Sequence, residues 1–211
     1  MNTALITDAI EAVQAAVLAH ESEIESLDRA IGDGDHFVNL KRGLSTLSAM
    51  REALLPLAPD AALQKMGMKL LSTIGGASGP LFASFFIAMA ASVKAQGEGD
   101  TAAVAAAFSA GVESIKQRGK AGLGEKTMLD VLIPVAVTFS RMAAEKTAMP
   151  ELLAAIQASA EAGMLSTRDL VATKGRAAFL GERAIGHIDA GAKSTQVMIS
   201  AVCKLVAGQH E

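Results

Sequence analysis

Apolar residues spaced three and four positions apart restrict this chain to a helical fold. In the first segment Leu5, Ala9, Val13 and Val17 follow this spacing, which places them on one face of an α-helix. Ala, Leu, Met, Glu, Lys and Gln, which favour helices, are common, whereas strand-like runs of Val, Ile, Tyr and Thr are missing. The sequence therefore predicts an all-α fold.

The length and the spacing of the turns predict one domain of antiparallel helices. The 211 residues, 51% of them hydrophobic, are enough for one well-buried domain, expected over residues 1–211. Most connections are short, so neighbouring helices should run in opposite directions. Ser78, Asp100 and Glu125 are the expected starts of three helices. The expected helices cover residues 3–28, 36–53, 60–74, 79–94, 101–118, 127–143, 150–167 and 192–207.

Charge and cysteine content exclude some classes of function. The net charge is −3, acids and bases are mixed along the chain, and no basic block appears, so nucleic-acid binding is not expected. The single cysteine, Cys203, cannot form an internal disulfide and lies in an apolar helix, where we expect it to be buried. The first ten residues do not resemble a signal peptide. These features favour a cytoplasmic protein.

One long uncharged stretch has the composition of a membrane span. Residues 70–93 form a run of 24 residues without a charge, but glycine and proline interrupt it between positions 75 and 80. The remaining continuous apolar helix, Leu81–Val93, has 13 residues, too few to cross about 30 Å of hydrocarbon. We therefore expect no membrane span here, but a helix fully buried inside the bundle.

Three aspartates form the densest cluster of potential ligands. Asp28, Asp33 and Asp35 fall within eight positions, and Gly32 and Gly34 flank the second of them. Side chains two positions apart in an extended segment project to the same side, and the glycines permit a tight turn. The three carboxylates can therefore converge on a hard cation. The alternative is helix punctuation, in which the acids only cap helix starts.

The spacing limits which cation such a cluster would bind. An EF-hand that began at Asp33 would need Gly at Val38 and Glu at Leu44, so that motif is excluded. Zinc is disfavoured because the chain has no set of Cys and His ligands. Carboxylate oxygens suit magnesium, which proteins often share with substrate phosphates. The cluster thus indicates a metal–phosphate site, with helix punctuation still open.

Three further segments have features of phosphate-binding sites. Residues 75–80 (GGASGP) precede a helix that Ser78 can cap, and the N–H groups at its start could bind a phosphate. The same sequence is equally typical of a plain turn between two helices. Residues 119–127 (GKAGLGEKT) miss the Walker motif because Glu125 separates Gly124 from the lysine, and they follow a helix, so a P-loop is rejected. The late loop 167–193 holds arginines that can clamp a phosphate or simply face solvent.

Taken together and in this order, four segments resemble the L subunit of dihydroxyacetone kinase. They read LDRAIGDGDHFVNLKRG, GGASGPLF, RGKAGLGEKTMLDVLIP and KGRAAFLGERAIGHIDAGAKS, within a resemblance that runs from about residue 5 to 205. This is the nucleotide-binding subunit, also found as the C-terminal domain of single-chain ATP-dependent kinases. The resemblance implies a barrel-like bundle of eight antiparallel helices with ADP or ATP and two magnesium ions at one end.

The resemblance also assigns residues. Asp28, Asp33 and Asp35 match the metal ligands of the family. The positions that match nucleotide contacts are His36, Asn39, Ala77, Ser78, Gly119, Thr127, Met128, Arg176, Asp189 and Gly191.

The implied activity is transfer of a γ-phosphoryl group to a short ketose held by a separate K subunit. By analogy, a phosphotransferase-system protein rephosphorylates the bound ADP, or ADP exchanges for ATP. The alternatives are another small ketose, such as a four-carbon one, and a non-catalytic, nucleotide-loaded subunit that binds a transcriptional regulator.

Two residues depart from the family pattern. Phe37 stands where Gly usually follows the histidine, and we expect its ring to turn into the core rather than to line the site. Ala190 stands where the late loop usually has Pro, which predicts a less pre-ordered loop.

Overall fold

The fold is entirely helical in the part of the chain that the computed structural model describes, residues 2–76, 78–97 and 99–209. No β-strand occurs among these residues, so the all-α prediction is confirmed. The long helices are α1 (Thr3–Ala19), α2 (Glu21–Ile31), α3 (His36–Ser48), α5 (Pro59–Thr73), α6 (Ser78–Gln96), α7 (Thr101–Gly119), α8 (Leu129–Ala144), α9 (Met149–Ser166) and α10 (Ala190–Gly208). The short elements are α4 (Arg51–Leu54) and the 3₁₀ segments η1 (Thr167–Asp169) and η2 (Arg176–Ala184).

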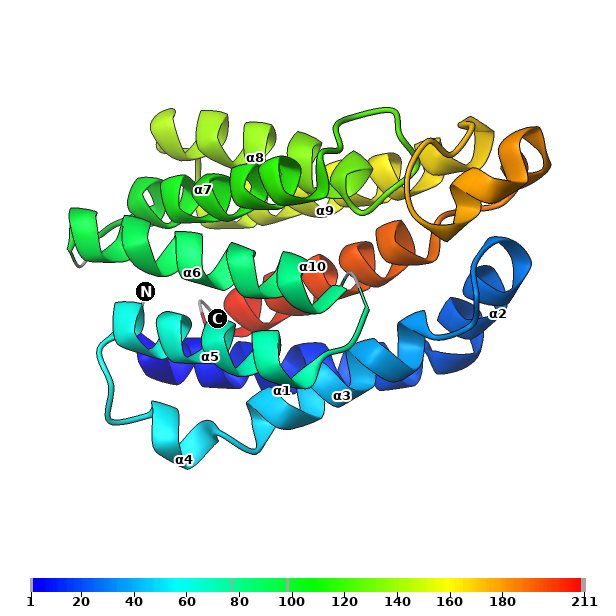
Figure 1. The fold of residues 1–211 in the computed structure, drawn as a ribbon. Helices are drawn as coiled ribbons and strands as arrows, with labels where there is room; N and C mark the ends of the chain where they lie inside the picture. Colours follow the sequence, from blue (N-terminus) through cyan, green and yellow to red (C-terminus); the bar gives the residue numbers. More distant parts are fainter. Residues whose placement is uncertain (1, 77, 98, 210–211) are drawn as a thin grey trace.

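The helices form a closed ring. From α5 to α10 each helix packs against the next, α10 packs against α1, α1 against α3, and α3 against α5. Successive members of the ring run in opposite directions (Figure 1). The starts of α3, α6, α8 and α10 therefore meet at the same end of the bundle, together with the end of α2 (Figure 1).

The interior of the ring is hollow and apolar. A cavity of about 610 Å³ lies inside it, and its lining includes Phe82, Phe85 and Met89 of α6. This corrects the expectation for the uncharged stretch: only 22% of the most apolar window of α6 is buried, because part of its surface faces this cavity. By length and composition alone α6 could cross a membrane, but it packs between α5 and α7 as a member of the ring.

Local capping explains several helix ends. The side chain of Asp100 accepts hydrogen bonds from the backbone N–H groups of Ala102 and Ala103, as its predicted place at the start of a helix requires. Ser78 begins α6 as predicted. Gly97, with a φ of 73°, follows the end of this helix.

Several predicted boundaries are wrong. The expected helix 3–28 is two helices, because His20 leaves the helical conformation with a ψ of 16°. The expected helix 36–53 likewise divides into α3 and α4. Glu125 does not start a helix, since α8 begins at Leu129. The late loop is shorter than expected, and it contains the 3₁₀ segments η1 and η2.

Phe37 lies in the core, as expected. Its ring is 1% exposed and belongs to a cluster with Val17, Ile24 and Val197, contributed by α1, α2 and α10. The neighbouring Val38 is 50% exposed, so of these two residues only Phe37 packs into the core. Cys203 is buried, as predicted.

The burial of Phe37 leads to a stability prediction. Phe37→Ala should lower the free energy of unfolding by about 3–5 kcal/mol, because it leaves a cavity among three helices. Val38→Ala, one position along the same helix, should change it by less than about 0.5 kcal/mol. Urea denaturation of both variants measures the two values, and equal effects would show that Phe37 is not a core residue.

Candidate functional site

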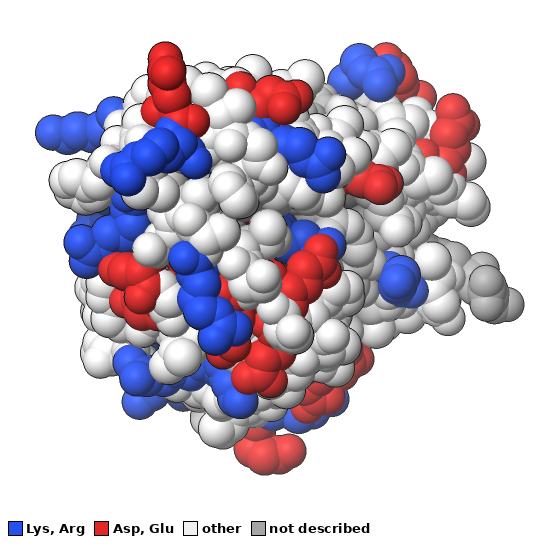
Figure 2. All heavy atoms as spheres, turned by 90° about the vertical axis from the view of Figure 1, so that its right-hand side faces the viewer, with Lys and Arg blue, Asp and Glu red and all other residues white. Residues whose placement is uncertain are grey.

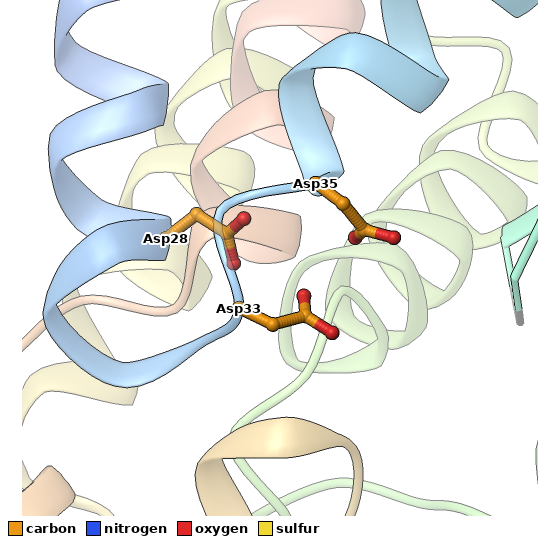
Figure 3. A group of neighbouring side chains, drawn as sticks. All are labelled: Asp28, Asp33 and Asp35. Atoms are coloured by element: carbon orange, nitrogen blue, oxygen red, sulfur yellow. The ribbon is translucent and has the colours of Figure 1, made fainter.

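The three aspartates converge at the end of the bundle. Asp28 lies near the end of α2, Asp33 lies in the following turn and Asp35 directly precedes α3 (Figure 3). One carboxylate oxygen of each lies within 4.8 Å of the others. Helix capping explains only Asp28, whose Oδ2 accepts a hydrogen bond of 3.0 Å from the backbone N–H of His36. Asp35 occupies the cap position of α3 but makes no capping hydrogen bond.

Two glycines make this turn possible. A Cβ atom on Gly32 would overlap the Oδ1 atom of Asp28, so a side chain here would displace that carboxylate. Gly34 adopts a φ of 78°, which disfavours other residues. The turn that brings the three acids together therefore depends on both glycines.

The negative charge of the cluster is only partly compensated. Loss of hydration, and then the neighbouring carboxylate of Asp33, raise the pKa of Asp35, while a hydrogen bond of 3.0 Å from the Asn39 side chain opposes this change. The Nε of Arg176, on η2, lies 2.6 Å from Oδ2 of Asp33. A cationic group thus already stands beside the cluster, as expected of a site that attracts positive charge.

His36 connects this turn to the last helix. Its Nε2 lies 2.9 Å from the Oγ of Ser194, which in turn donates a hydrogen bond to the carbonyl of Gly191. Burial lowers the pKa of His36, although the nearby Asp28 and Asp35 act in the opposite direction. The imidazole therefore favours its neutral form and links the start of α3 to the start of α10.

The turn between α5 and α6 lies beside Asn39, at the end of the bundle that carries the aspartates. Cβ atoms on Gly75 and Gly76 would lie 3.8 and 4.0 Å from the side-chain amide of Asn39. Ser78 follows as the first residue of α6. Ala77, which the family resemblance also assigns to the nucleotide, lies outside the described residues.

The carboxylates of Asp130 and Glu125 accept hydrogen bonds from the backbone of the loop 120–128 and so hold its conformation. Asp130, which is buried, accepts hydrogen bonds from the backbone N–H groups of Gly124 (2.6 Å) and Thr127 (2.7 Å). Glu125 accepts one from the N–H of Gly122 (2.5 Å). These donors are already satisfied, so this loop does not present them to a phosphate as a P-loop would.

The late loop, residues 167–189, contacts the loop 120–128. Glu125 accepts a hydrogen bond of 2.7 Å from the hydroxyl of Thr173, and this bond is the first cause of its lowered pKa. Asp189 caps α10 through Ala192, and loss of hydration raises the pKa of Asp189 to about 6. A Cβ atom on Gly191 would lie 3.7 Å from the backbone nitrogen of Met128, so the two loops are close neighbours.

The described residues that the resemblance assigned therefore lie around one end of the bundle. Gly119, the last residue of α7, completes the set, because its Cβ would lie 3.4 Å from the Leu81 side chain in the first turn of α6. Figure 2 shows this end, where acidic and basic side chains are interspersed rather than separated.

Comparison with known proteins agrees with this geometry. Residues 30–204 match the DAK2 domain. The chain belongs to the DAK2 domain family. This confirms the resemblance to the L subunit of dihydroxyacetone kinase.

Several DAK2 relatives match over most of the chain. The ADP-binding subunit DhaL of the PEP-dependent dihydroxyacetone kinase of Escherichia coli (strain K12) is 40% identical over 87% of this chain and 88% of its own. The corresponding subunit of kinase 2 of Listeria innocua is 38% identical, covering 96% and 94%. The crystal structure of the dihydroxyacetone kinase of C. freundii superimposes with a TM-score of 0.75 at 26% identity, over 97% of this chain and 35% of that one.

Sequence reasoning missed four residues that build this DAK2 site. They are Lys126, Asp130, Thr167 and Ser194, and all four are buried. Asp130 carried a usable signal, because an acid in the first turn of a helix can bind the N–H groups that precede it. The contacts of the others join segments far apart in the sequence: Lys126 reaches residues 41 and 61 positions away, and Ser194 meets a histidine 158 positions away.

The role of Asp130 can be tested by an isosteric change. Asp130→Asn should lower the free energy of unfolding by about 1–3 kcal/mol, because the amide supplies one acceptor where two backbone donors each need one. Asp100→Asn is the matched control: a single oxygen of Asp100 accepts both of its bonds, and Asn caps helices equally well. Thermal unfolding of the two variants gives the comparison, and an unchanged Asp130→Asn would contradict the capping role.

Proposed function

We propose that this chain, as one L-type domain over residues 1–211, is the ADP- and ATP-binding subunit of a dihydroxyacetone-type kinase. It transfers a phosphoryl group through magnesium-bound nucleotide to a short ketose held by a separate K subunit. The observation that carries the proposal is the convergence of Asp28, Asp33 and Asp35 at the end of the bundle where the other assigned residues gather. The relatives named as ADP-binding subunits of such kinases support it.

The donor set fits magnesium. All three ligands offer carboxylate oxygens, two of them are exposed, and an arginine already stands beside Asp33. A solved relative, the C. freundii kinase, is described in complex with AMP-PNP and Mg²⁺, and this chain shares its fold. We assign two ions to the site, held by Asp28, Asp33 and Asp35. Magnesium supplies neutralisation of the phosphate charge during transfer.

The residues of this chain bind and orient the nucleotide. Arg176 is mostly exposed, so its guanidinium can leave Asp33 and grip phosphate oxygens with its forked donors. His36 and Asn39 hold the turn that carries the acids, and Ser78 begins a helix whose first N–H groups suit an anion. Ala77 is assigned to the nucleotide by the resemblance alone. Gly119, Thr127 and Met128 line the nucleotide together with the neighbouring Asp189 and Gly191.

Transfer moves the γ-phosphoryl group from ATP to a ketose hydroxyl, which loses its proton, and ADP remains on this subunit. We propose a K subunit as its partner, because relatives matched over most of their own length are named as ADP-binding subunits of dihydroxyacetone kinases. The relatives of Escherichia coli and Lactococcus lactis are named as PEP-dependent and PTS-dependent, so a phosphotransferase-system protein is the proposed phosphoryl donor, and the proposed location is the cytoplasm. A transcriptional regulator is a further proposed partner.

The alternative substrate loses its main support. A four-carbon ketose would be favoured if Phe37 lined the mouth of the site and changed which sugar can reach the phosphate, but the ring of Phe37 is buried between helices. Dihydroxyacetone therefore remains the proposed acceptor.

The metal assignment predicts the effect of two isosteric changes. Asp33→Asn and Asp35→Asn should each weaken magnesium-dependent ADP binding by at least about tenfold, since even partners outside the first ligand shell contribute that much in metal sites. The helical content should not change, because neither side chain caps a helix. Calorimetry with and without magnesium measures the loss, with Asp100→Asn as the control. Unchanged affinity in both variants would refute the metal site.

Bound nucleotide should stabilise the fold. A ligand at about a thousand times its dissociation constant adds roughly 4 kcal/mol, which corresponds to a rise of about 8–16 °C in Tm for a chain of this size. The reason is that the site joins segments from four places in the chain. Differential scanning fluorimetry with millimolar ADP and magnesium tests this, and a Tm that ignores both would contradict nucleotide binding.

A further inference from the structure

Lys126 is a buried cation that the proposed function does not use. Its side chain is 1% exposed, and its backbone adopts a φ of 61°, which is uncommon for residues other than glycine. Its Nζ donates hydrogen bonds of 2.5 Å to two backbone carbonyls, those of Thr167 and His187. A buried lysine is expensive to maintain unless its ammonium is paired and hydrogen-bonded.

The electrostatic surroundings compensate for this burial. Loss of hydration lowers the pKa of Lys126, while the carboxylates of Asp189, Asp169 and Asp130 act in the opposite direction. Two of these acids belong to the segment from 167 to 189 and the third to α8. The ammonium therefore lies where the loop 120–128, the start of α8 and this late segment come together.

The two carbonyls that Lys126 binds stand at the two ends of the late segment. Thr167 directly follows α9, and His187 lies two residues before the cap of α10. The hydroxyl of Thr167 also accepts a hydrogen bond of 3.1 Å from the backbone N–H of Asp189. One ammonium group thus closes the segment 167–189 at its base and attaches it to the loop 120–128.

We propose that Lys126 is a positioning residue for nucleotide binding. Its ammonium holds the late segment against the loop 120–128, so that Asp189 and Gly191 stay beside Thr127 and Met128 where the nucleotide binds. The neighbouring Glu125 adds an outer contact through Thr173, but that contact is exposed and contributes less. This inference rests on the proposed function for its ligand, while the attachment of the two loops exists without any nucleotide.

A purely structural lysine would behave differently from a positioning one. Loss of a structural lysine lowers the Tm and leaves the affinity of the folded protein for ADP unchanged. Loss of a positioning lysine releases the late segment within a folded protein, so the affinity falls at temperatures where the variant is fully folded.

The test compares Lys126→Met with Lys146→Met. Methionine keeps the length of the side chain and removes the ammonium. Lys146 has a similar φ of 53° but is exposed in the turn between α8 and α9, so it controls for the backbone conformation. Calorimetry with ADP and magnesium, well below the Tm of each variant, should show an affinity loss of about 5- to 150-fold for Lys126→Met, the usual range for energetic coupling, and none for Lys146→Met.

Hydrogen exchange of the nucleotide-free proteins supplies the second measurement. In Lys126→Met the amides of Gly186 and Asp189, which bond within the late segment, should exchange faster, while those of α1 and α5 keep their protection. Equal ADP affinity of folded Lys126→Met and the wild type would overturn the proposal, and so would unchanged exchange in the late segment. A wild-type protein that binds no ADP would refute the proposed function instead, and the exchange result would still decide the attachment.

If Lys126→Met does not fold, Thr167→Val takes its place. It removes the hydroxyl that accepts the N–H of Asp189 and keeps the shape of the side chain. The proposal expects faster exchange in residues 167–189 and weaker ADP binding in this variant too. Loss of stability with neither change would overturn it.

Discussion

The contact between the first and last helices of the ring is the constraint on which the site depends. When α10 packs against α1, the start of α10 comes beside the turn that carries the three aspartates. His36 then meets Ser194, a residue 158 positions away. Without this closure the acids would remain a local turn, and Asp189 and Gly191 would not face them. The antiparallel order of the ring sets which helix ends share the site, and the apolar interior holds the ring together.

Charges at this end are divided between holding the loops and facing a ligand. Asp28 binds the first N–H of α3, Asp130 binds two N–H groups of the loop before α8, and Asp189 caps α10. Each of these carboxylates is anchored by backbone donors. Asp33 and Asp35 accept no backbone donor among the described contacts, so their charge remains available to a cation. The raised pKa of Asp35 comes first from loss of hydration and then from the neighbouring carboxylate of Asp33.

Local patterns predicted what local interactions build. The helical class followed from apolar spacing, the start of α7 from Asp100, and the aspartate cluster from two glycines within one turn. Glu125 was misassigned because an acid before an apolar run resembles a helix cap, yet its carboxylate turns back to Gly122 and out to Thr173. Lys126 could not be placed at all, since nothing beside it in the sequence shows that its acceptors are carbonyls of the segment between α9 and α10.

In the late loop, hydrogen bonds from distant residues take the place of the backbone restraint that a proline would provide. A proline before Gly191 would fix the backbone directly after the cap of α10, and this chain has Ala190 there, with a buried side chain. The sequence alone therefore predicted a looser loop. In the structure the N–H of Asp189 is bound by the Thr167 hydroxyl, and the carbonyl of His187 is bound by Lys126. These bonds restrain residues 187 and 189, directly before the position where the proline would stand. The conformation of the late loop thus depends on an ammonium group from another part of the chain. The absence of proline at position 190 does not by itself make this loop mobile.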